Sequence, residues 1–219
     1  MSDLNNINGI IWDLDNTLYR FDESFLHVCN RAAAQTMLEL GLQKSEQEAF
    51  DMALNSYQKC GNSFRVFMDM GFDYTKMHHA YHDRVSHDTI ILINDLRETM
   101  ESLPHKMVVL TNASRAWAQK VLVKTKLNSM FGDHNVVCLE DVAYKAKSQH
   151  SDGFLLAKER GEMNKIPNEE ILVVEDIAHN LIHAKNMRMV TALVHSPATN
   201  DAHIDHHFDE VMDLCHALK

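Results

Sequence analysis

The sequence contains little glycine and proline, and its cysteines are widely spaced. With seven glycines and three prolines among 219 residues, no stretch has the composition of a flexible linker. The four cysteines lie far apart and form no Cys-x-x-Cys pair, and three of them lie in apolar or helical contexts. We therefore expect reduced, buried thiols and no linker that separates two halves of the chain.

Basic charge and long apolar runs are also missing. Lysine and arginine number 21 against 31 acidic residues, and a net charge of −10 argues against a nucleic-acid partner. No apolar run approaches the roughly 20 residues that cross a bilayer. Residues 1–6 are polar and lack the basic and then apolar segments of a secretion signal. We therefore expect a cytoplasmic protein with no membrane partner.

A short buried strand that ends in two carboxylates is the most informative stretch. Residues 10–12 are apolar, as in a parallel strand covered on both faces, and Asp13 and Asp15 follow before a turn at residues 16–17. The carboxyl ends of parallel strands are where open α/β sheets bind ligands. Two adjacent buried carboxylates favour a shared divalent metal. An acidic turn that only caps the next helix is the alternative at this point.

A block of helices follows the first strand. Apolar residues recur at helical spacing over residues 21–40, and Gly41 ends that stripe. Ser45 and Glu48 form a capping-box pattern at the start of a helix over 45–58, which breaks at residues 61–62. Shorter helices are expected over 63–70 and 74–82, and no strand between 20 and 90. We interpret residues 19–90 as an inserted helical cap domain.

An alternation of strands and helices occupies the rest of the chain. Residues 1–18 and 91–219 are therefore expected to form an α/β core with a Rossmann-like, doubly wound parallel sheet. The expected strands are 107–110, 136–139, 171–174 and 190–194, and the expected helices are 90–103, 115–124, 152–161, 179–187 and 210–218.

Polar residues follow three of these strands and would share one crevice at the same sheet edge. The residues concerned are Asp13, Asp15, Thr111, Asn112, Glu175 and Asp176. Four carboxylates make an oxygen-rich site that suits Mg²⁺. One carboxylate could attack phosphorus while a second exchanges protons, help that is worth about 10²–10⁴ in rate. A lysine would balance the remaining charge.

The series Asp13-Leu-Asp15-Asn-Thr-Leu, Thr111-Asn112, a lysine and Glu175-Asp176 resembles the four motifs of the haloacid dehalogenase superfamily, in order and along essentially the whole chain. The resemblance implies an aspartyl-phosphate on Asp13, general acid–base catalysis by Asp15, and phosphoryl binding by Thr111 and Asn112. It also implies Mg²⁺ held by Asp13, the backbone carbonyl of Asp15, and Asp176, with Glu175 nearby.

The lysine motif departs from the family pattern, because both of its usual prolines are missing. Lys147 is our choice for the lysine, with Lys145 as the reserve. Without proline to fix φ, a looser loop is expected. Two solvated lysines and an impaired site are the alternative. Arg115, just after residues 111–112, is a further candidate for binding the substrate anion.

The resemblance also bears on the reaction. Asp15 favours phosphoryl transfer over dehalogenation, because an alkoxide leaving group needs a proton and a halide does not. The first motif and the all-helical cap are similar to the pyrimidine 5′-nucleotidase-like branch. We expect an Mg²⁺-dependent phosphomonoesterase that acts on a small phosphorylated metabolite, with a nucleoside monophosphate as one candidate. The alternatives are a phosphoglycolate phosphatase, a sugar phosphatase or phosphomutase, and a non-enzymatic binding module. The oligomeric state is open.

Histidine is abundant, with fifteen in the chain. His203 and His207 would lie one turn apart if their segment were helical, which would allow an adventitious metal site. We favour the simpler interpretation that these histidines are surface residues before the last helix.

Overall fold

The computed structural model describes residues 4–60 and 63–219, and these divide into two compact units. One unit runs to Arg20 and resumes at Leu92, and the other comprises Phe21–Ile91. The helix break expected at residues 61–62 lies outside the described residues. Among those residues, no helix combines the length and the apolar character needed to cross a bilayer.

The first unit is built on a six-stranded parallel sheet with the strand order β3-β2-β1-β4-β5-β6. Its strands are β1 (Gly9–Trp12), β2 (Lys106–Leu110), β3 (Val136–Val137), β4 (Ile171–Glu175), β5 (Val190–Val194) and β6 (His206–Phe208). Every residue of β1, β4 and β5 is buried, which explains their largely apolar sequences. The predicted parallel α/β fold is confirmed.

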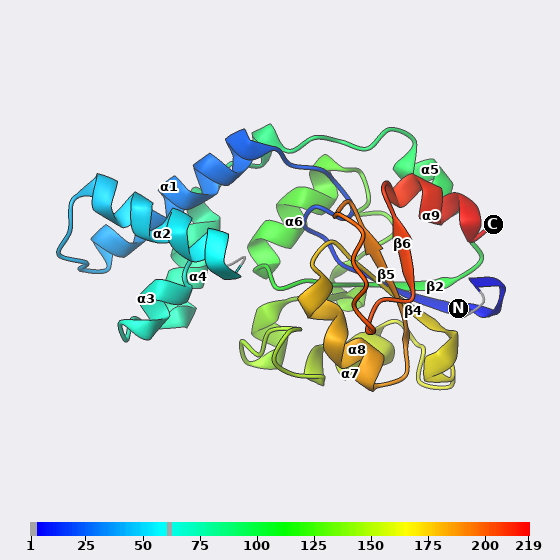
Figure 1. Cartoon of the computed structure of the whole chain (residues 1–219). Helices are drawn as coiled ribbons and strands as arrows, with labels where there is room; N and C mark the ends of the chain where they lie inside the picture. Colours follow the sequence, from blue (N-terminus) through cyan, green and yellow to red (C-terminus); the bar gives the residue numbers. More distant parts are fainter. Residues whose placement is uncertain (1–3, 61–62) are drawn as a thin grey trace. The chain divides into compact units, whose positions relative to one another are not determined.

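Helices cover both faces of this sheet, as Figure 1 shows, with α7 and α8 on one side and α5, α6 and α9 on the other. The helices are α5 (Leu96–Glu101), α6 (Arg115–Lys124), α7 (Asp152–Arg160), α8 (Ile182–Asn186) and α9 (Val211–Ala217). Phe154 and Ala157 of α7 and Ala184 of α8 pack on the apolar side chains of β1, β2 and β4. β1 lies at the centre of the sheet, so its carboxyl end is flanked by those of β2 and β4.

The second unit is helical throughout its described residues between Phe21 and Ile90, apart from turns. It contains α1 (Glu23–Glu39), α2 (Glu46–Cys60), α3 (Arg65–Asp69) and α4 (Tyr74–Arg84), as well as a 3₁₀ turn at His87–Thr89. The capping box before α2 is confirmed, because Glu48 N–H donates to Ser45 Oγ at 3.2 Å and Ser45 N–H to Glu48 Oε2 at 2.9 Å. Gly41 follows α1 with a φ of +100°, which favours glycine. Methionine, phenylalanine and alanine side chains from all four helices form its core.

Several expectations about local structure were wrong. The helix expected over 90–103 is only α5, because Asp95 takes a left-handed φ of 56° immediately before it. The strand expected over 136–139 ends at Val137, where Cys138 begins a 3₁₀ turn. The helix expected over 179–187 begins as a 3₁₀ turn, Ala178–Leu181, before α8.

The histidine-rich segment near the end of the chain is a strand, β6, and not part of a helix. His203 Nε2 lies 2.9 Å from the carbonyl oxygen of Ala178, and His207 Nε2 lies 2.5 Å from that of Ser196. These histidines are therefore half-buried groups that bond to backbone, and helical spacing does not bring them together.

Three of the cysteines, Cys29, Cys138 and Cys215, are free and buried, as expected for reduced thiols. Burial raises the pKa of the Cys138 and Cys215 thiols to about 12. Both thiols therefore stay protonated and unreactive at neutral pH.

Candidate functional site

The carboxyl ends of β1 and β4 bring three carboxylates together. Trp12 pairs with Val174 in the sheet, so Asp13 and Glu175 follow at the same level, and Asp13 N–H donates to the Val174 carbonyl at 2.9 Å. Asp176 directly follows the end of β4, and one carboxylate oxygen from each of the three residues lies within 4.8 Å of the others. Parallel pairing of two short strands is thus enough to create this concentration of negative charge.

Lys147 completes what we call the acidic cluster, namely Asp13, Lys147, Glu175 and Asp176. Its ammonium lies 2.5 Å from Asp13 Oδ1 and 2.5 Å from Glu175 Oε1, and it also donates to the Leu110 carbonyl at 3.1 Å. The side chain is only 3% exposed. The backbone N–H of Lys147 donates to Asn112 Oδ1 at 3.1 Å, which holds the lysine loop without either of the usual prolines.

The acidic cluster is not electrically balanced. With all three carboxylates ionised, the single ammonium of Lys147 would leave the cluster with a net charge of −2. Burial, and then the neighbouring Glu175, raise the pKa of Asp13 to about 8, although Lys147 opposes the shift. Burial, and then the neighbouring Glu175 and Asp13, raise the pKa of Asp176 well above its usual range. Burial also disfavours the Lys147 ammonium, but Asp13 and Glu175 outweigh that effect and raise its pKa.

The hydrogen bonds of the cluster distinguish its three carboxylates. Both oxygens of Glu175 have donors, since Oε1 accepts from Asn180 Nδ2 and Oε2 from Ile177 N–H, each at 2.8 Å. Asp176 Oδ2 accepts from Asn16 Nδ2 at 3.0 Å. Asp13 Oδ2 is buried and has no hydrogen-bond partner among the described residues. An unpartnered buried carboxylate oxygen beside excess negative charge is the arrangement that a hard divalent cation fits.

Asp15 lies beside this cluster and is held by three side chains. Tyr19 Oη and Trp117 Nε1 each donate to Asp15 Oδ1 at 2.7 Å, and Thr111 Oγ1 donates to Asp15 Oδ2 at 3.1 Å. Asn16, next in the chain, has a φ of 56°, a conformation that asparagine tolerates better than most residues. The turn after β1 therefore orients Asp15 toward β2 and α6, and Asn16 toward Asp176.

The end of β2 supplies the two residues expected to bind phosphate. Thr111 is buried, and its Oγ1 accepts from the backbone N–H of Ala113 at 3.0 Å. Ser114 then caps α6, because its Oγ accepts from Trp117 N–H at 3.2 Å. The helix thus starts directly at the site. Through Thr111 and Asn112 this segment contacts Asp15 and the backbone of Lys147.

Two of the predicted phosphate-binding residues do not contact the acidic cluster. Lys145 forms an exposed ion pair with Asp152 at 2.7 Å, which leaves Lys147 as the lysine of the site. The guanidinium of Arg115 lies 2.5 Å from Asp141 Oδ2 and also donates to the Val136 carbonyl at 3.2 Å. Arg115 was a candidate because it closely follows the end of β2. The first residue of a helix can, however, turn its side chain away from the strand ends.

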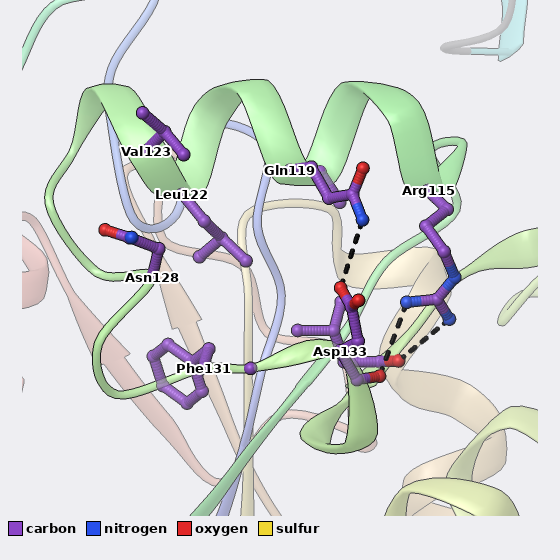
Figure 2. Close-up of a pocket in the computed structure, with 10 residues that line it drawn as sticks. Arg115, Gln119, Leu122, Val123, Asn128, Phe131 and Asp133 are labelled. Carbon is purple, nitrogen blue, oxygen red and sulfur yellow. Dashed lines mark hydrogen bonds between the residues drawn. The ribbon is translucent and has the colours of Figure 1, made fainter.

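Figure 2 shows Arg115 at the rim of a cavity of about 460 Å³ beside α6. Leu122 and Phe131 contribute apolar surface to it, and Gln119 Nε2 donates to Asp133 Oδ1 at 3.0 Å. Arg115 Nη1 donates to the Asp133 carbonyl at 3.4 Å. The side chains of Arg115 and Gln119 are thus already bonded to protein groups at this cavity.

Several residues of this site were not among the predicted ones. Trp117 reaches Asp15 across 102 positions of sequence, and no local pattern indicates such a contact. Asn180 reaches Glu175 only because the chain turns after β4. Tyr19 was the one with a possible signal, because it lies four residues after Asp15 in a tight turn.

One family model matches most of the chain. Residues 10–194 match the family model described as haloacid dehalogenase-like hydrolase. No curated protein matches the sequence at a significant level. Solved structures that resemble the chain include CbbY from Rhodobacter sphaeroides in complex with phosphate, which is 18% identical, with a TM-score of 0.67 and coverage of 95% of this chain and 96% of that one.

Two further structures have the same fold. A HAD phosphatase from Thermococcus onnurineus is 18% identical, with a TM-score of 0.64 and coverage of 97% of this chain and 98% of that one. The putative HAD-hydrolase YfnB from Bacillus subtilis, bound to magnesium, is 13% identical, with a TM-score of 0.63 and coverage of 97% and 99%. The family model spans most of the chain and includes every residue of the acidic cluster. The chain belongs to the haloacid dehalogenase-like hydrolases, and it is an enzyme of the hydrolase class.

Proposed function

We propose that the enzyme is an Mg²⁺-dependent phosphomonoesterase that works through an aspartyl-phosphate on Asp13. The observation that carries the proposal is the unbalanced acidic cluster, in which Asp13 Oδ2 is buried without a hydrogen-bond partner among the described residues. A divalent cation would cancel the net charge of −2. It would also let Asp13 stay ionised, as a nucleophile must be.

The residues divide into binding and chemical roles. Asp13 Oδ2, Asp176 and the backbone carbonyl of Asp15 would hold Mg²⁺, with Glu175 beside it as the partner of Lys147. When bound, Mg²⁺ would offset negative charge on the phosphoryl oxygens. Thr111, Asn112 and Lys147 would bind the phosphoryl group, since they converge on the same strand ends.

The reaction would proceed in two displacements. Asp13 attacks phosphorus, the bond from phosphorus to the ester oxygen breaks, and protonated Asp15 gives its proton to the departing oxygen. Water then attacks the aspartyl-phosphate and passes a proton to Asp15, which releases inorganic phosphate and restores both carboxyl groups. Lys147 stays charged throughout, because two carboxylates stabilise its ammonium.

The substrate proposed is a small phosphorylated metabolite, and nucleoside monophosphates belong in the first set of compounds to be tested. The helical unit, residues 21–91, is proposed as the cap that selects among such compounds. Burial of Lys147 between Asp13 and Glu175 supports an intact enzyme over a degraded binding module, although neither proline of the lysine motif is present.

Phosphate release from a panel of esters tests this proposal. The panel would hold nucleoside monophosphates, sugar phosphates, phosphoglycolate and p-nitrophenyl phosphate, each assayed with Mg²⁺ and with EDTA. We expect release that requires Mg²⁺ and disappears in Asp13→Asn. Release that persists in EDTA, or in purified Asp13→Asn, would contradict the proposed nucleophile and cofactor. A second product that keeps the phosphate would indicate a phosphomutase.

A further inference from the structure

Asp15 accepts hydrogen bonds unevenly on its two oxygens. Oδ1 accepts two short bonds, from Tyr19 Oη and Trp117 Nε1, both at 2.7 Å, whereas Oδ2 accepts from Thr111 Oγ1 at a longer 3.1 Å. A carboxylate oxygen offers two lone-pair positions, so the two donors on Oδ1 fill it. The two oxygens of this carboxylate are therefore not equivalent.

The chemistry of the donors determines which oxygen of Asp15 can carry a proton. An indole N–H can only donate, so a proton on Oδ1 would face the Trp117 N–H and break that bond. A hydroxyl both donates and accepts, so Thr111 can keep its contact with Oδ2 after that oxygen takes a proton. A proton on Asp15 is thus disfavoured on Oδ1 and accommodated on Oδ2.

Both Oδ1 donors lie on rigid parts of the α/β unit. Trp117 is 3% exposed and belongs to the first turn of α6, which Ser114 caps at 3.2 Å. Tyr19 is fully buried at the end of a turn in which the Thr17 and Leu18 N–H groups both donate to the Leu14 carbonyl. Neither ring can follow Asp15 if its carboxylate rotates, so the pair fixes the carboxylate plane.

We propose that Trp117 and Tyr19 are positioning residues that anchor Oδ1 of Asp15, so that Oδ2 alone exchanges the proton. The inference rests on the proposed phosphatase function. In the first step the bond from phosphorus to the ester oxygen breaks as Asp13 attacks, and the proton on Oδ2 moves to that oxygen. In the second step a water O–H bond breaks, its proton returns to Oδ2, and the oxygen bonds to phosphorus as the bond to Asp13 breaks.

Esters whose leaving groups differ in basicity distinguish the loss of Asp15 positioning from a general structural defect at the site. An alkoxide is a strong base and needs the proton of Asp15 as it departs, whereas p-nitrophenolate is stable without one. Loss of the anchor should therefore harm an alkyl phosphate much more than p-nitrophenyl phosphate. A structural defect at the site, in contrast, would lower both activities together.

The test compares kcat/KM for glycerol 2-phosphate and p-nitrophenyl phosphate in wild type, Trp117→Phe, Tyr19→Phe and the double variant, with Mg²⁺ present. We expect each single variant to lose about 10-fold, and the double variant about 100-fold, on glycerol 2-phosphate, within the range that acid–base help supplies. On p-nitrophenyl phosphate each should lose less than about 3-fold. Any active phosphate ester of an alcohol found in the panel can replace glycerol 2-phosphate.

Trp12→Phe is the matched control. Trp12 is also a buried tryptophan, and its Nε1 has no hydrogen-bond partner among the described residues. It should lower both activities by the same factor, if it lowers them at all. Should Trp117→Phe fail to fold, as judged by thermal melting, Tyr19→Phe decides the question on its own.

Equal losses on the two esters in Trp117→Phe and Tyr19→Phe, or no loss on either, would overturn the inference and leave the phosphatase standing. The same unequal loss in Trp12→Phe would overturn it too. If wild type releases no phosphate from any ester, the proposed function itself fails and the inference falls with it.

Discussion

Two groups of charged side chains in the same α/β unit are built in opposite ways. The acidic cluster holds three carboxylates and one ammonium, and the pKa values of Asp13 and Asp176 are raised. The arginine cluster, defined as Arg115, Asp141 and Arg160, lies beside the edge strand β3 and holds two guanidiniums around one carboxylate.

The two clusters differ in whether their polar groups all have hydrogen-bond partners. In the arginine cluster, Asp141 Oδ2 accepts from Arg115, from Arg160 and from Cys138 N–H, at 2.5, 2.9 and 2.8 Å. Both guanidiniums also donate to the Val136 carbonyl. The acidic cluster instead leaves a buried oxygen of Asp13 unpartnered within the described part of the chain. A cluster that satisfies its own groups supports the fold, whereas one with buried excess charge indicates a ligand.

The largest expected effect comes from Asp13→Asn. The change removes the proposed nucleophile, so we expect kcat to fall by at least about 10³-fold. It also replaces a carboxyl group whose ionised form is disfavoured in the folded state, since burial and Glu175 raise the pKa of Asp13 to about 8, so in EDTA the melting temperature should rise and not fall. Steady-state assays and thermal melts of the same preparation measure both. Lost activity together with a lower melting temperature would mean that Asp13 supports the fold.

Lys147→Met should be the most damaging change to stability. It leaves Asp13 and Glu175, both buried, without their cation, which we expect to lower the free energy of unfolding by about 3 kcal/mol and to abolish activity. Lys145→Met is the matched control, because that lysine forms only an exposed pair with Asp152, and it should leave both properties unchanged. Urea unfolding in EDTA provides the comparison. Activity lost in Lys145→Met but kept in Lys147→Met would reverse the assignment.

Asp141→Asn should act on stability alone. Burial opposes ionisation of Asp141, but bonds from Arg160 and Cys138 N–H and the charge of Arg115 outweigh it and lower its pKa. We expect a loss of about 1–3 kcal/mol with kcat unchanged. Because the folded pKa lies below the unfolded value of about 3.9, the stabilisation is complete above that pH and is lost as pH falls through the folded pKa.

Urea unfolding of wild type and Asp141→Asn at a series of pH values measures this difference. The gap between the two proteins should stay constant from pH 7 toward about 5 and then narrow below about 4. A gap that widens on acidification, or a large fall in kcat at neutral pH, would show that the arginine cluster serves the active site.

The comparison also shows what a sequence can and cannot indicate. Strand β1 and the two aspartates that follow it could be predicted, because buried parallel strands have largely apolar sequences and their carboxyl ends are where ligands bind. Helix α6 was predicted with its observed bounds, and the structure shows that Ser114 caps it. Alternation of strands and helices fixed the fold class.

Side-chain direction was the part that could not be predicted. Arg115 and Trp117 lie two positions apart on α6, yet Arg115 bonds to Asp141 and Trp117 to Asp15. Lys145 and Lys147 are also two positions apart, yet Lys145 forms an exposed ion pair and Lys147 lies in the buried cluster. β6 went unnoticed because His206–Phe208 is short and half-buried, and its place in the sheet depends on pairing with β5.

The most direct measurement is the shift in melting temperature that Mg²⁺ produces in wild type, Asp176→Asn and Asp141→Asn. A ligand at 100 times its dissociation constant stabilises the folded state by about 2.7 kcal/mol, so binding is easily detected. We predict that Mg²⁺ raises the melting temperature of wild type and Asp141→Asn and loses most of its effect on Asp176→Asn. The same shift in all three proteins, or none in wild type, would contradict a divalent-cation site in the acidic cluster.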